Sequence, residues 1–467
     1  MNEILKINSM LNDFVWGVPM IVLLLGVGAF LCFSTGFWIY RNFGYILKNT
    51  FGQIFKKADS NDSTITPFQA VSTALAGTIG TGNIVGVATA ISFGGPGAIF
   101  WMWLAAVIGM TTKFTEVTLS LATREKGKDG KFTGGPMYYL KKGTRFKFLA
   151  YLFSFFGFIA PLGTGAMVQA NAIATSVNDT FGLDVKIAGI ILSILMALVI
   201  IGGIKRIGAF AEKVVPIMSL FYVIGALIIL FIQRKEILNA FVIIFESAFN
   251  PKAAGGSFAG FSVMTAIRWG LARGIFTNEA GIGTAPIAHS ASHTDHPARQ
   301  GIWGSFEVFM DTIVVCTMTA LVIITSGLWK DSNLEGILLT SNAFSNALPV
   351  GKYIVNIGLM LFAFSTAVSW DYYGEKCILF IYNSDIVRII YRIIYIVLCF
   401  VGAIGGLKFV WDIADTFNGL MAIPNLIGIL LLSKSAKRLI KDFERIKYSK
   451  QKRDYSLEYD NKWKEFF

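Results

Sequence analysis

Charged residues are scarce in this sequence. Only 15% of its 467 residues are Asp, Glu, Lys or Arg, whereas soluble domains usually contain about 25%. Hydrophobic residues make up 54%, and glycine (47) and phenylalanine (40) are abundant. This balance excludes an ordinary water-soluble enzyme and a disordered protein. It is typical of a polytopic membrane protein whose helices pack against each other and against lipid.

Cysteine and histidine are also rare. The four cysteines lie in apolar stretches without CxxC spacing and are expected to be small buried hydrophobic residues: Cys32, Cys316, Cys377 and Cys399. The three histidines, His289, His293 and His296, recur at i, i+4 and i+7. They form either a metal-binding face or, as the adjacent Pro297 favours, a polar helix end.

Sequence motifs for ATP binding and for nucleophilic catalysis are absent from the sequence. The chain has no Walker loop and no pairing of a nucleophile with a base, so neither ATP-driven transport nor an enzyme is indicated. No cleavable signal peptide is evident at the amino terminus, so the first hydrophobic run is expected to remain as a helix. We expect no cofactor.

Long apolar runs predict eleven membrane-spanning helices, since a bilayer core needs about 20 apolar residues per helix. The predicted all-α fold has spans at 14–38, 67–92, 97–123, 148–178, 187–203, 208–232, 260–290, 301–327, 351–378, 387–406 and 409–433. The intervening loops alternate in charge, and we assign 30 of the 41 Lys and Arg residues to one side, 8 to the other and 3 to the spans.

This one-sided excess is the positive-inside pattern and not a nucleic-acid footprint, although the net charge is +12. The carboxyl terminus is therefore predicted to be cytoplasmic and the amino terminus external, in a bacterial or archaeal plasma membrane. Segment 233–259 is expected to form an external helix or a re-entrant piece. The basic tail 434–467 is either a solvated segment, which we favour, or an amphipathic helix on lipid.

Two spans contain clusters of glycine and polar residues that disfavour a continuous helix. The second predicted span carries Gly77, Gly80, Gly82 and Gly86, and the seventh is similarly rich between Gly270 and Pro286. These spans are five apart, so each begins a five-helix half with inverted topology: 1–66 leads, 67–232 and 260–433 are the repeats, and 233–259 connects them. Paired broken helices in inverted repeats indicate a transporter binding site, although close helix packing also explains Gly82 and Gly86.

The first break offers complementary groups for a zwitterion. Backbone amides at Thr81 and Gly82 suit a carboxylate, and carbonyls near Ala76 and Ile79 suit an ammonium or a sodium ion. Thr78, Asn83, Thr277 and Asn278 could complete either shell. Gln169 is expected to face the helix bundle, where it contacts either substrate or a neighbouring helix.

The charged residues in the spans are interpreted as structural or gating groups, whereas the hydroxyls of Thr366 and Ser369 either bind an ion or bond back to their own helix. Thr366 and Ser369 share one helical face beside Trp370, although Ser365 competes for that register. Lys113 and Glu116 have the spacing of a neutralising pair. A buried network is predicted among Arg268, Arg273, Glu279, Glu307 and Asp311.

The sequence resembles the alanine or glycine:cation symporter family, also called the sodium:alanine symporters. The resemblance rests on the long run 77–116 and on 134–140, 273–290, 294–323 and 362–376, in order along nearly the whole chain. It implies a LeuT-like inverted repeat of five plus five helices, preceded here by one extra helix. It also implies uptake of a small neutral amino acid, alanine or glycine, driven by sodium; proton coupling and a channel are the alternatives.

The resemblance also implies the roles of individual residues. Thr81 and Gly82 would hold the carboxylate near Thr78 and Asn83, while Gln169, Gly274, Phe276, Thr277 and Trp370 would line the pocket. Carbonyls of Ala76 and Ile79 with hydroxyls of Thr366 and Ser369 would bind sodium. The expected partners are the amino acid, the sodium ion and the lipid bilayer, and the protein is expected to be a monomer.

Overall fold

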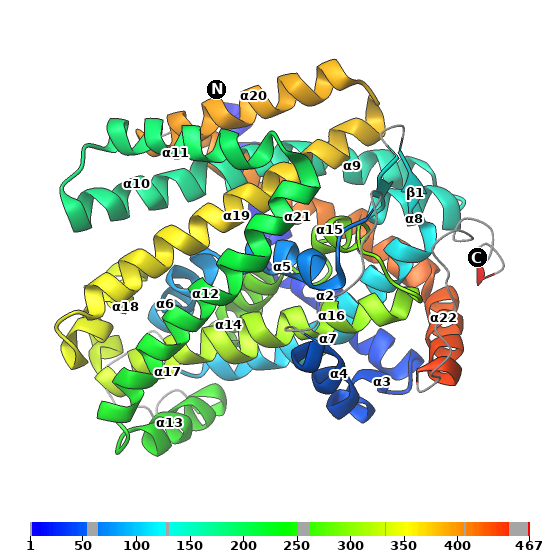
Figure 1. Cartoon of the computed structure of the whole chain (residues 1–467). Coiled ribbons are helices and arrows are strands. Elements are labelled where there is room, and N and C mark those ends of the chain that lie inside the picture. Colours follow the sequence, from blue (N-terminus) through cyan, green and yellow to red (C-terminus); the bar gives the residue numbers. More distant parts are fainter. Residues whose placement is uncertain are drawn as a thin grey trace.

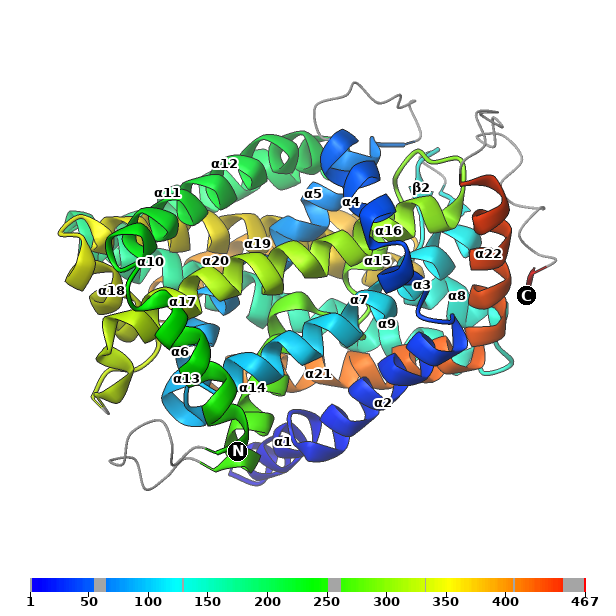
Figure 2. The same ribbon diagram turned by 90° about the horizontal axis from the view of Figure 1, so that it is seen from below.

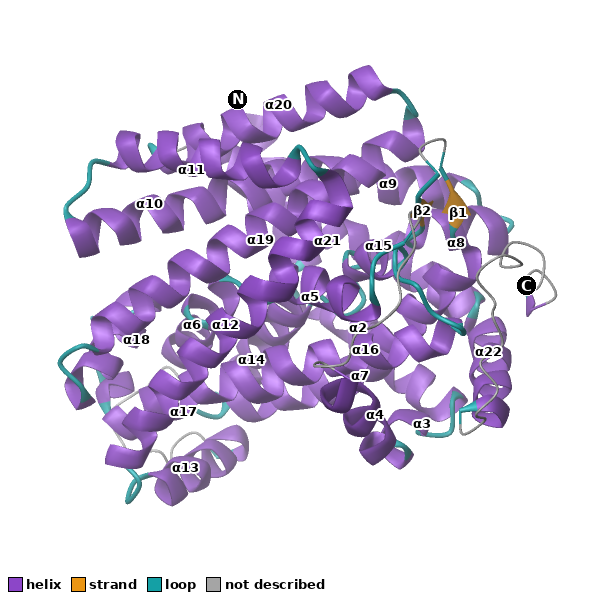
Figure 3. Cartoon of the chain, in the orientation of Figure 1, coloured by secondary structure: helices purple, strands orange, loops and turns teal. Residues whose placement is uncertain are grey.

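Helices form nearly all of the structure. The computed structural model describes residues 2–53, 64–127, 130–250, 262–331, 333–405, 408–447 and 466–467. The named strands in these ranges form one short antiparallel hairpin, β1 (Glu125–Lys126) with β2 (Phe132–Thr133), which is shown in orange in Figure 3. The expectation of an all-α architecture is confirmed, and the hairpin is a small addition to it.

The leading span begins earlier than predicted. Helix α1 (Asn2–Val15) and helix α2 (Val18–Ser34) are separated at Gly17, and Pro19 lies in the first turn of α2. The apolar span covers Lys6–Ser34, not 14–38. Polar residues of α1, such as Asn12, disguise this start because they face the protein and not the lipid.

The first five predicted spans after the leader follow in chain order. A capping box between Thr66 and Gln69 starts the first of them. The elements up to this repeat's end are α3 (Trp38–Arg41), α4 (Phe43–Thr50), η1 (Phe51–Gln53), α5 (Pro67–Thr78), η2 (Thr81–Asn83), α6 (Val85–Gly94), α7 (Ala98–Thr123), α8 (Pro136–Gly143), α9 (Phe148–Ala160), the π-helix η3 (Pro161–Met167), α10 (Val168–Phe181), α11 (Val185–Ile200) and α12 (Gly203–Ile232).

The second half has the same helical character. The eighth predicted span of the chain belongs to this half. It starts at Pro297 and not at 301, because His296 caps the helix there. The elements are α13 (Ile237–Phe249), α14 (Val263–Asn278), α15 (Ala285–His289), α16 (Pro297–Val308), the π-helix η5 (Phe309–Cys316), α17 (Thr317–Ser326), η6 (Leu328–Lys330), α18 (Gly336–Ala347), α19 (Gly351–Ile381), α20 (Asp385–Ala403), α21 (Lys408–Leu431) and α22 (Ser433–Ile446).

Eight helices of the described residues are long and apolar enough to cross a membrane. They are Lys6–Ser34, Ala98–Thr123, Phe148–Phe181, Gly203–Ile232, Pro297–Ser326, Gly351–Ile381, Asp385–Ala403 and Asp412–Leu431. The other three predicted spans coincide with α5 and α6, with α11, and with α14 and α15, which are shorter or interrupted. The chain is a multi-pass membrane protein, and the count of eleven spans stays a prediction.

The broken helices lie at the centre of the molecule. Helix α5 packs against α12 and α19, and helix α14 packs against α6 and α7. Figures 1 and 2 place α8 and α22 at one end of the bundle and α13 and α18 at the opposite end. Helices α11 and α20 are peripheral, and α20 exposes a row of apolar side chains of the kind that faces lipid: Ile386, Ile389, Ile390, Ile393 and Val397.

The beginning of the basic tail corrects both predictions made for it. Helix α22 buries its apolar face on α2, α7, α16 and α21, so this face is neither solvated nor free to lie on lipid, while the charged face is exposed. Leu439 and Phe443 are fully buried, and the Phe443 ring lies 5.9 Å from that of Trp38. Residues 448–465 of the tail and 251–259 of the connector lie outside the described residues.

Candidate substrate and ion site

The first predicted break is present at the expected place. Helix α5 ends at Thr78, Ile79 and Gly80 are extended, and a short 3-10 turn over Thr81–Asn83 leads into α6. The amides of Thr81 and Gly82 open this turn, and the first N–H groups of a helical turn have no acceptor within it. The break therefore presents polar backbone in the buried centre of the bundle, where lipid-exposed irregular backbone would be too costly.

Three side chains of α19 contact backbone carbonyls of α5 or of the break that follows it. The Thr366 hydroxyl lies 3.4 Å from the Ile79 carbonyl oxygen, and the Ser369 hydroxyl donates to the Thr73 carbonyl at 2.8 Å. The Trp370 indole N–H donates to the Gly77 carbonyl at 3.3 Å.

The register of α19 that the sequence left open follows from these contacts. Thr366 and Ser369 face α5, whereas Ser365 faces Met218 of α12 at 3.4 Å. Thr366 thus lies beside Ile79, and its hydroxyl also donates to the Phe362 carbonyl of its own helix at 2.9 Å. The Ser369 hydroxyl donates to the carbonyl of Thr73, which lies about one turn before the predicted ligand Ala76. The Ala76 side chain is fully buried.

Gly82 and Thr277 bring the two broken helices together. A Cβ atom at Gly82 would lie 2.7 Å from Cγ2 of Thr277, which is too close for any side chain. The second break follows directly after Thr277: Glu279 adopts the left-handed conformation, and α15 starts at Ala285. The predicted pairing of two interrupted helices is therefore seen as a direct contact between them.

Several predicted ligands bond the protein itself, among them Thr78, Asn83 and Thr277, whose hydroxyl donates to the Gly274 carbonyl at 2.9 Å. The Thr78 hydroxyl lies 3.3 Å from the Ala74 carbonyl of its own helix. The Asn83 side chain accepts the Gly80 N–H at 2.8 Å and donates to the Asp311 carboxylate at 2.7 Å. Asn83 therefore braces the break in this structure.

Asp311 links both breaks, a role that the sequence did not predict. Its second oxygen accepts the Thr312 hydroxyl at 2.7 Å, and Thr312 in turn accepts the Asn278 amide at 3.2 Å. Asp311 and Thr312 lie in the π-helix η5, a distortion that is frequent at functional sites. The signal in the sequence was the polar row of Asp311, Thr312 and Thr319 in an otherwise apolar span.

Gln169 faces the bundle interior, as predicted. Its amide donates to the Thr164 carbonyl at 3.2 Å, but its buried Oε1 atom has no hydrogen-bond partner among the described residues. It lies four residues after Gly165, where a Cβ atom would collide with Trp370. The Gln169 oxygen is thus an unused acceptor on the helix that packs against Trp370.

Gly274 and Phe276 lie away from the first break. Gly274 faces Met102 of α7, and the Phe276 ring makes an edge contact with Trp16 at a centroid distance of 5.7 Å. Phe276 also lies beneath the Arg273 guanidinium, 5.6 Å from its ring centroid. The structure therefore places these two residues on other sides of α14 from Thr277.

The buried charges pair differently from the prediction. Lys113 reaches Glu307 of α16 at 3.4 Å, while Glu116 accepts the Asn425 amide at 2.5 Å, so the predicted pair of Lys113 with Glu116 is wrong. The i, i+3 spacing puts both on one face of α7, but α16 and α21 cover different parts of that face.

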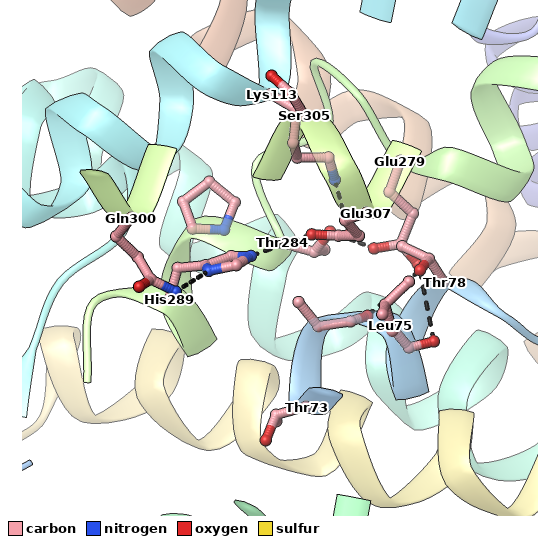
Figure 4. Close-up of polar contacts among 12 residues, drawn as sticks. Thr73, Leu75, Thr78, Lys113, Glu279, Thr284, His289, Gln300, Ser305 and Glu307 are labelled. Carbon is pink, nitrogen blue, oxygen red and sulfur yellow. Dashed lines mark hydrogen bonds and ion pairs between the residues drawn. The ribbon is translucent and has the colours of Figure 1, made fainter. Parts of the chain in front are cut away.

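The predicted five-residue network is split as well. Glu307 also bonds His289 at 3.1 Å, and Glu279 bonds Thr284, as Figure 4 shows. Arg268 and Arg273 lie elsewhere, at a cavity beside Asp415. Glu279, Glu307 and Asp311 stay close to one another, so helix packing separates only the two arginines from the predicted network.

The histidines do not converge. His289 bonds Glu307 and Gln300, while His296 caps α16 by accepting the Ala298 N–H at 3.0 Å. No group of three His, Cys, Asp or Glu side chains able to hold a metal occurs among the described residues. The interpretation of a polar helix end is the one that these contacts fit. The four cysteines are buried and free.

Solved structures of low sequence identity share this architecture. MhsT, solved in complex with L-phenylalanine, matches 83% of this chain and 99% of its own chain with a TM-score of 0.55 and 14% identity. The LeuT-like fold that we expected is thereby confirmed.

Curated relatives are similar over almost the whole chain. A sodium/alanine symporter of Methanococcus maripaludis is 46% identical over 457 residues, which cover 96% of this chain and 99% of the relative. A probable sodium/glutamine symporter of Bacillus subtilis is 37% identical and covers 96% and 92%. A putative sodium/proton-dependent alanine carrier of the same organism is also 37% identical, covering 94% and 92%.

The family model agrees with these relatives. The model of the sodium:alanine symporter family matches residues 1–457. With this match, the paired breaks and the LeuT-like fold, the chain belongs to the sodium:alanine symporter family.

Proposed function

We propose that this protein imports a small neutral amino acid, alanine in the first place, together with sodium by alternating access. The observation that carries the proposal is the break between α5 and α6, where a carbonyl faces Thr366 and the amides of Thr81 and Gly82 open the next turn. One short segment thus offers opposite polarities a few residues apart. A zwitterion and its coupling cation need such a pair of surfaces.

The amino acid would lie between the two broken helices. Its carboxylate would accept hydrogen bonds from the Thr81 and Gly82 amides, because anions are favoured at the amino end of a helical turn. Its ammonium group would donate to the Gln169 oxygen, which has no partner among the described residues. Thr277 and Trp370 would limit the room for the side chain.

The sodium ion would lie between α5 and α19. Oxygen ligands of hard cations sit about 2.3–2.6 Å from the ion, so neighbouring ligands are about 3.3–3.7 Å apart. The 3.4 Å separation between the Thr366 hydroxyl and the Ile79 carbonyl fits this range. Ser369 would complete the shell with the carbonyl of Ala76 after a rotation away from Thr73.

We assign the end with α8 and α22 to the cytoplasm and the end with α13 and α18 to the outside. The asymmetry of Lys and Arg supports this orientation. Substrate would then enter from the end with α13 and α18.

Uptake into proteoliposomes tests this function. Labelled alanine is supplied with an inward sodium gradient, with an inward proton gradient, or with neither. We expect saturable accumulation with the sodium gradient alone. Accumulation with protons alone would establish proton coupling, and equilibration without any gradient dependence would indicate a channel.

Competition by other amino acids defines the substrate, since one relative is named for glutamine. We expect glycine and serine to compete with alanine more strongly than glutamine or leucine, because overfilling a packed pocket costs about 1–3 kcal/mol. Equal competition by glutamine would refute the small-substrate assignment.

A further inference from the structure

A cavity lies between the leading helix, α14 and α21. It has a volume of about 180 Å³ and is lined by residues that include Asn12, Trp16, Arg268, Arg273, Phe276 and Asp415. With about 30 Å³ for each water in the liquid, this space suits a molecule as small as alanine. The sequence predicts a structural or gating role for both arginines and no contact with substrate.

Arg273 has an unusual environment for a charged side chain. Its guanidinium carbon lies 5.4 Å from the ring centroid of Trp269 and 5.6 Å from that of Phe276. Among the described residues it forms no hydrogen bond and no ion pair within 4 Å, and Asp415 across the cavity is the charged group that attracts it. Aromatic faces support the cation, but they leave its N–H groups free to bind an anion in the fork geometry that suits a carboxylate.

The opposite wall of the cavity carries the opposite charge. The Asp415 carboxylate accepts the Asn12 amide at 3.0 Å, and the Trp16 indole N–H donates to the Asp415 carbonyl at 3.3 Å. Both donors belong to the leading region before α2. This region therefore holds Asp415 in place without neutralising it, and the cavity presents a cation and an anion to any zwitterion inside it.

The cavity adjoins the first break. A Cβ atom at Gly86 of α6 would lie 4.0 Å from Cδ of Arg273 and 3.9 Å from Cγ2 of Thr277. Thr277 is the residue that packs on Gly82. One turn of α14 thus separates the free guanidinium from the amides of the central site.

We propose that this cavity is a capture site in which Arg273 binds the carboxylate of the incoming amino acid before the Thr81 and Gly82 amides do, while Asp415 faces the ammonium group. The inference rests on the proposed function. A site of fixed charge in a narrow cleft speeds the arrival of a complementary ligand more than it changes the final affinity of the central site.

The test compares Arg273→Gln with Arg234→Gln in the full-length protein. Arg234 is exposed, lies 5.3 Å from the ring centroid of Phe231 and donates to the carbonyl of that same residue at 3.4 Å, so its loss is the matched control. Two quantities are measured: the KM of sodium-driven alanine uptake, and the equilibrium Kd of alanine in detergent with saturating sodium.

We expect Arg273→Gln to raise the KM about tenfold and to change the Kd less than about threefold, because a capture site acts on the rate of arrival. Arg273→Lys should fall between wild type and Arg273→Gln, since it keeps the charge but loses the planar fork. The Arg234→Gln control should match wild type in both quantities.

Two results would overturn the capture site. One is an unchanged KM in Arg273→Gln; the other is a parallel rise of KM and Kd, which would place Arg273 in the central site or in the fold. Failure of wild type to take up alanine with sodium would instead refute the proposed function, so the two failures are distinguishable.

Discussion

Single residues at the break have roles that depend on contacts between the two halves of the chain. Gly82 is needed because Thr277 occupies the space where its side chain would be. Thr366 and Ser365 are adjacent in sequence, yet only Thr366 faces α5. Substitutions at these positions therefore test the proposed site with closely matched controls.

Replacing Gly82 by alanine should weaken alanine binding by about 1–3 kcal/mol, the usual cost of overpacking. The new methyl group would lie 2.7 Å from the Thr277 methyl group. It would therefore displace the Thr81 and Gly82 amides from the position in which they bind the carboxylate. Equilibrium binding of labelled alanine measures the effect. Gly26→Ala is the control, because a Cβ atom there meets open space.

A second substitution separates packing from other causes. Thr277→Ser removes the methyl group that Gly82→Ala would strike, so the double variant should recover most of the lost affinity. Wild-type affinity in the single variant, or no recovery in the double variant, would contradict the close approach of these two helices.

Replacing Thr366 by alanine should raise the sodium concentration that gives half-maximal uptake by a factor of about 10 to 150, because loss of a charge-assisted ligand costs about 1.5–3 kcal/mol. Ser365→Ala should leave it unchanged, since that hydroxyl faces Met218. Uptake is measured across a sodium series at fixed alanine. Equal behaviour of the two variants would move the sodium site away from this face of α19.

At the scale of elements, the docked tail helix is the main feature that pattern alone misjudged. Helix α22 contacts the start of α16, where the His296 ring lies 5.2 Å from the Phe443 ring and Nε2 lies 3.5 Å from the Asp442 carboxylate. The Arg299 guanidinium also lies over Phe443, at 5.2 Å. The helix thus depends on contacts with a histidine outside the spanning segment.

Acid should loosen α22. Burial lowers the pKa of His296, and this outweighs the opposing effect of Asp442 and Asp295, while Arg299 lowers it further. A histidine with a lowered pKa gives its full stability above its unfolded pKa of about 6.5, and this stability is lost as the pH falls below that value. The protection factors of residues 433–446 in hydrogen exchange, which correct for the slower intrinsic exchange of amides in acid, should therefore be lower at about pH 5.5 than at about pH 7.5.

The control for this prediction is the neighbouring histidine. His293→Gln should keep the pH dependence, because His293 does not contact α22 in the described contacts, whereas Phe443→Ala should give fast exchange at both pH values. Equal protection of α22 at the two pH values in wild type would contradict the role of His296.

At the scale of the whole molecule, each end of the bundle carries a helix with exposed positions that can be labelled. Helix α22 lies at the end with α8, and α18 lies at the opposite end. All four native cysteines are buried, which keeps background labelling low. This arrangement allows the orientation in the membrane to be measured directly.

Single cysteines at two exposed positions should report opposite sides. Asn342→Cys in α18 should react with a membrane-impermeant maleimide on intact cells, whereas Glu444→Cys in α22 should react only after the membrane is permeabilised. The charge asymmetry is the physical reason for this expectation. Labelling of Glu444→Cys on intact cells would invert the proposed topology.

The sequence by itself determined the membrane class, the helical fold and the two broken helices. These features follow from local properties: apolar length for each span, and glycine with polar residues at Gly80–Asn83 and Gly281–Thr284, which disfavour a continuous helix. The sequence also predicted that the two breaks are paired, because the broken spans are five spans apart and each begins one of the two halves.

The partners of individual side chains were decided only by the tertiary structure. Lys113 bonds Glu307 and not Glu116, Asn83 bonds Asp311, and Phe276 turns to Trp16. Periodicity places a residue on a helix face but does not say which helix covers that face. That choice depends on the packing of elements hundreds of residues apart, which is why the docking of α22 and the cavity at Arg273 emerged from the structure alone.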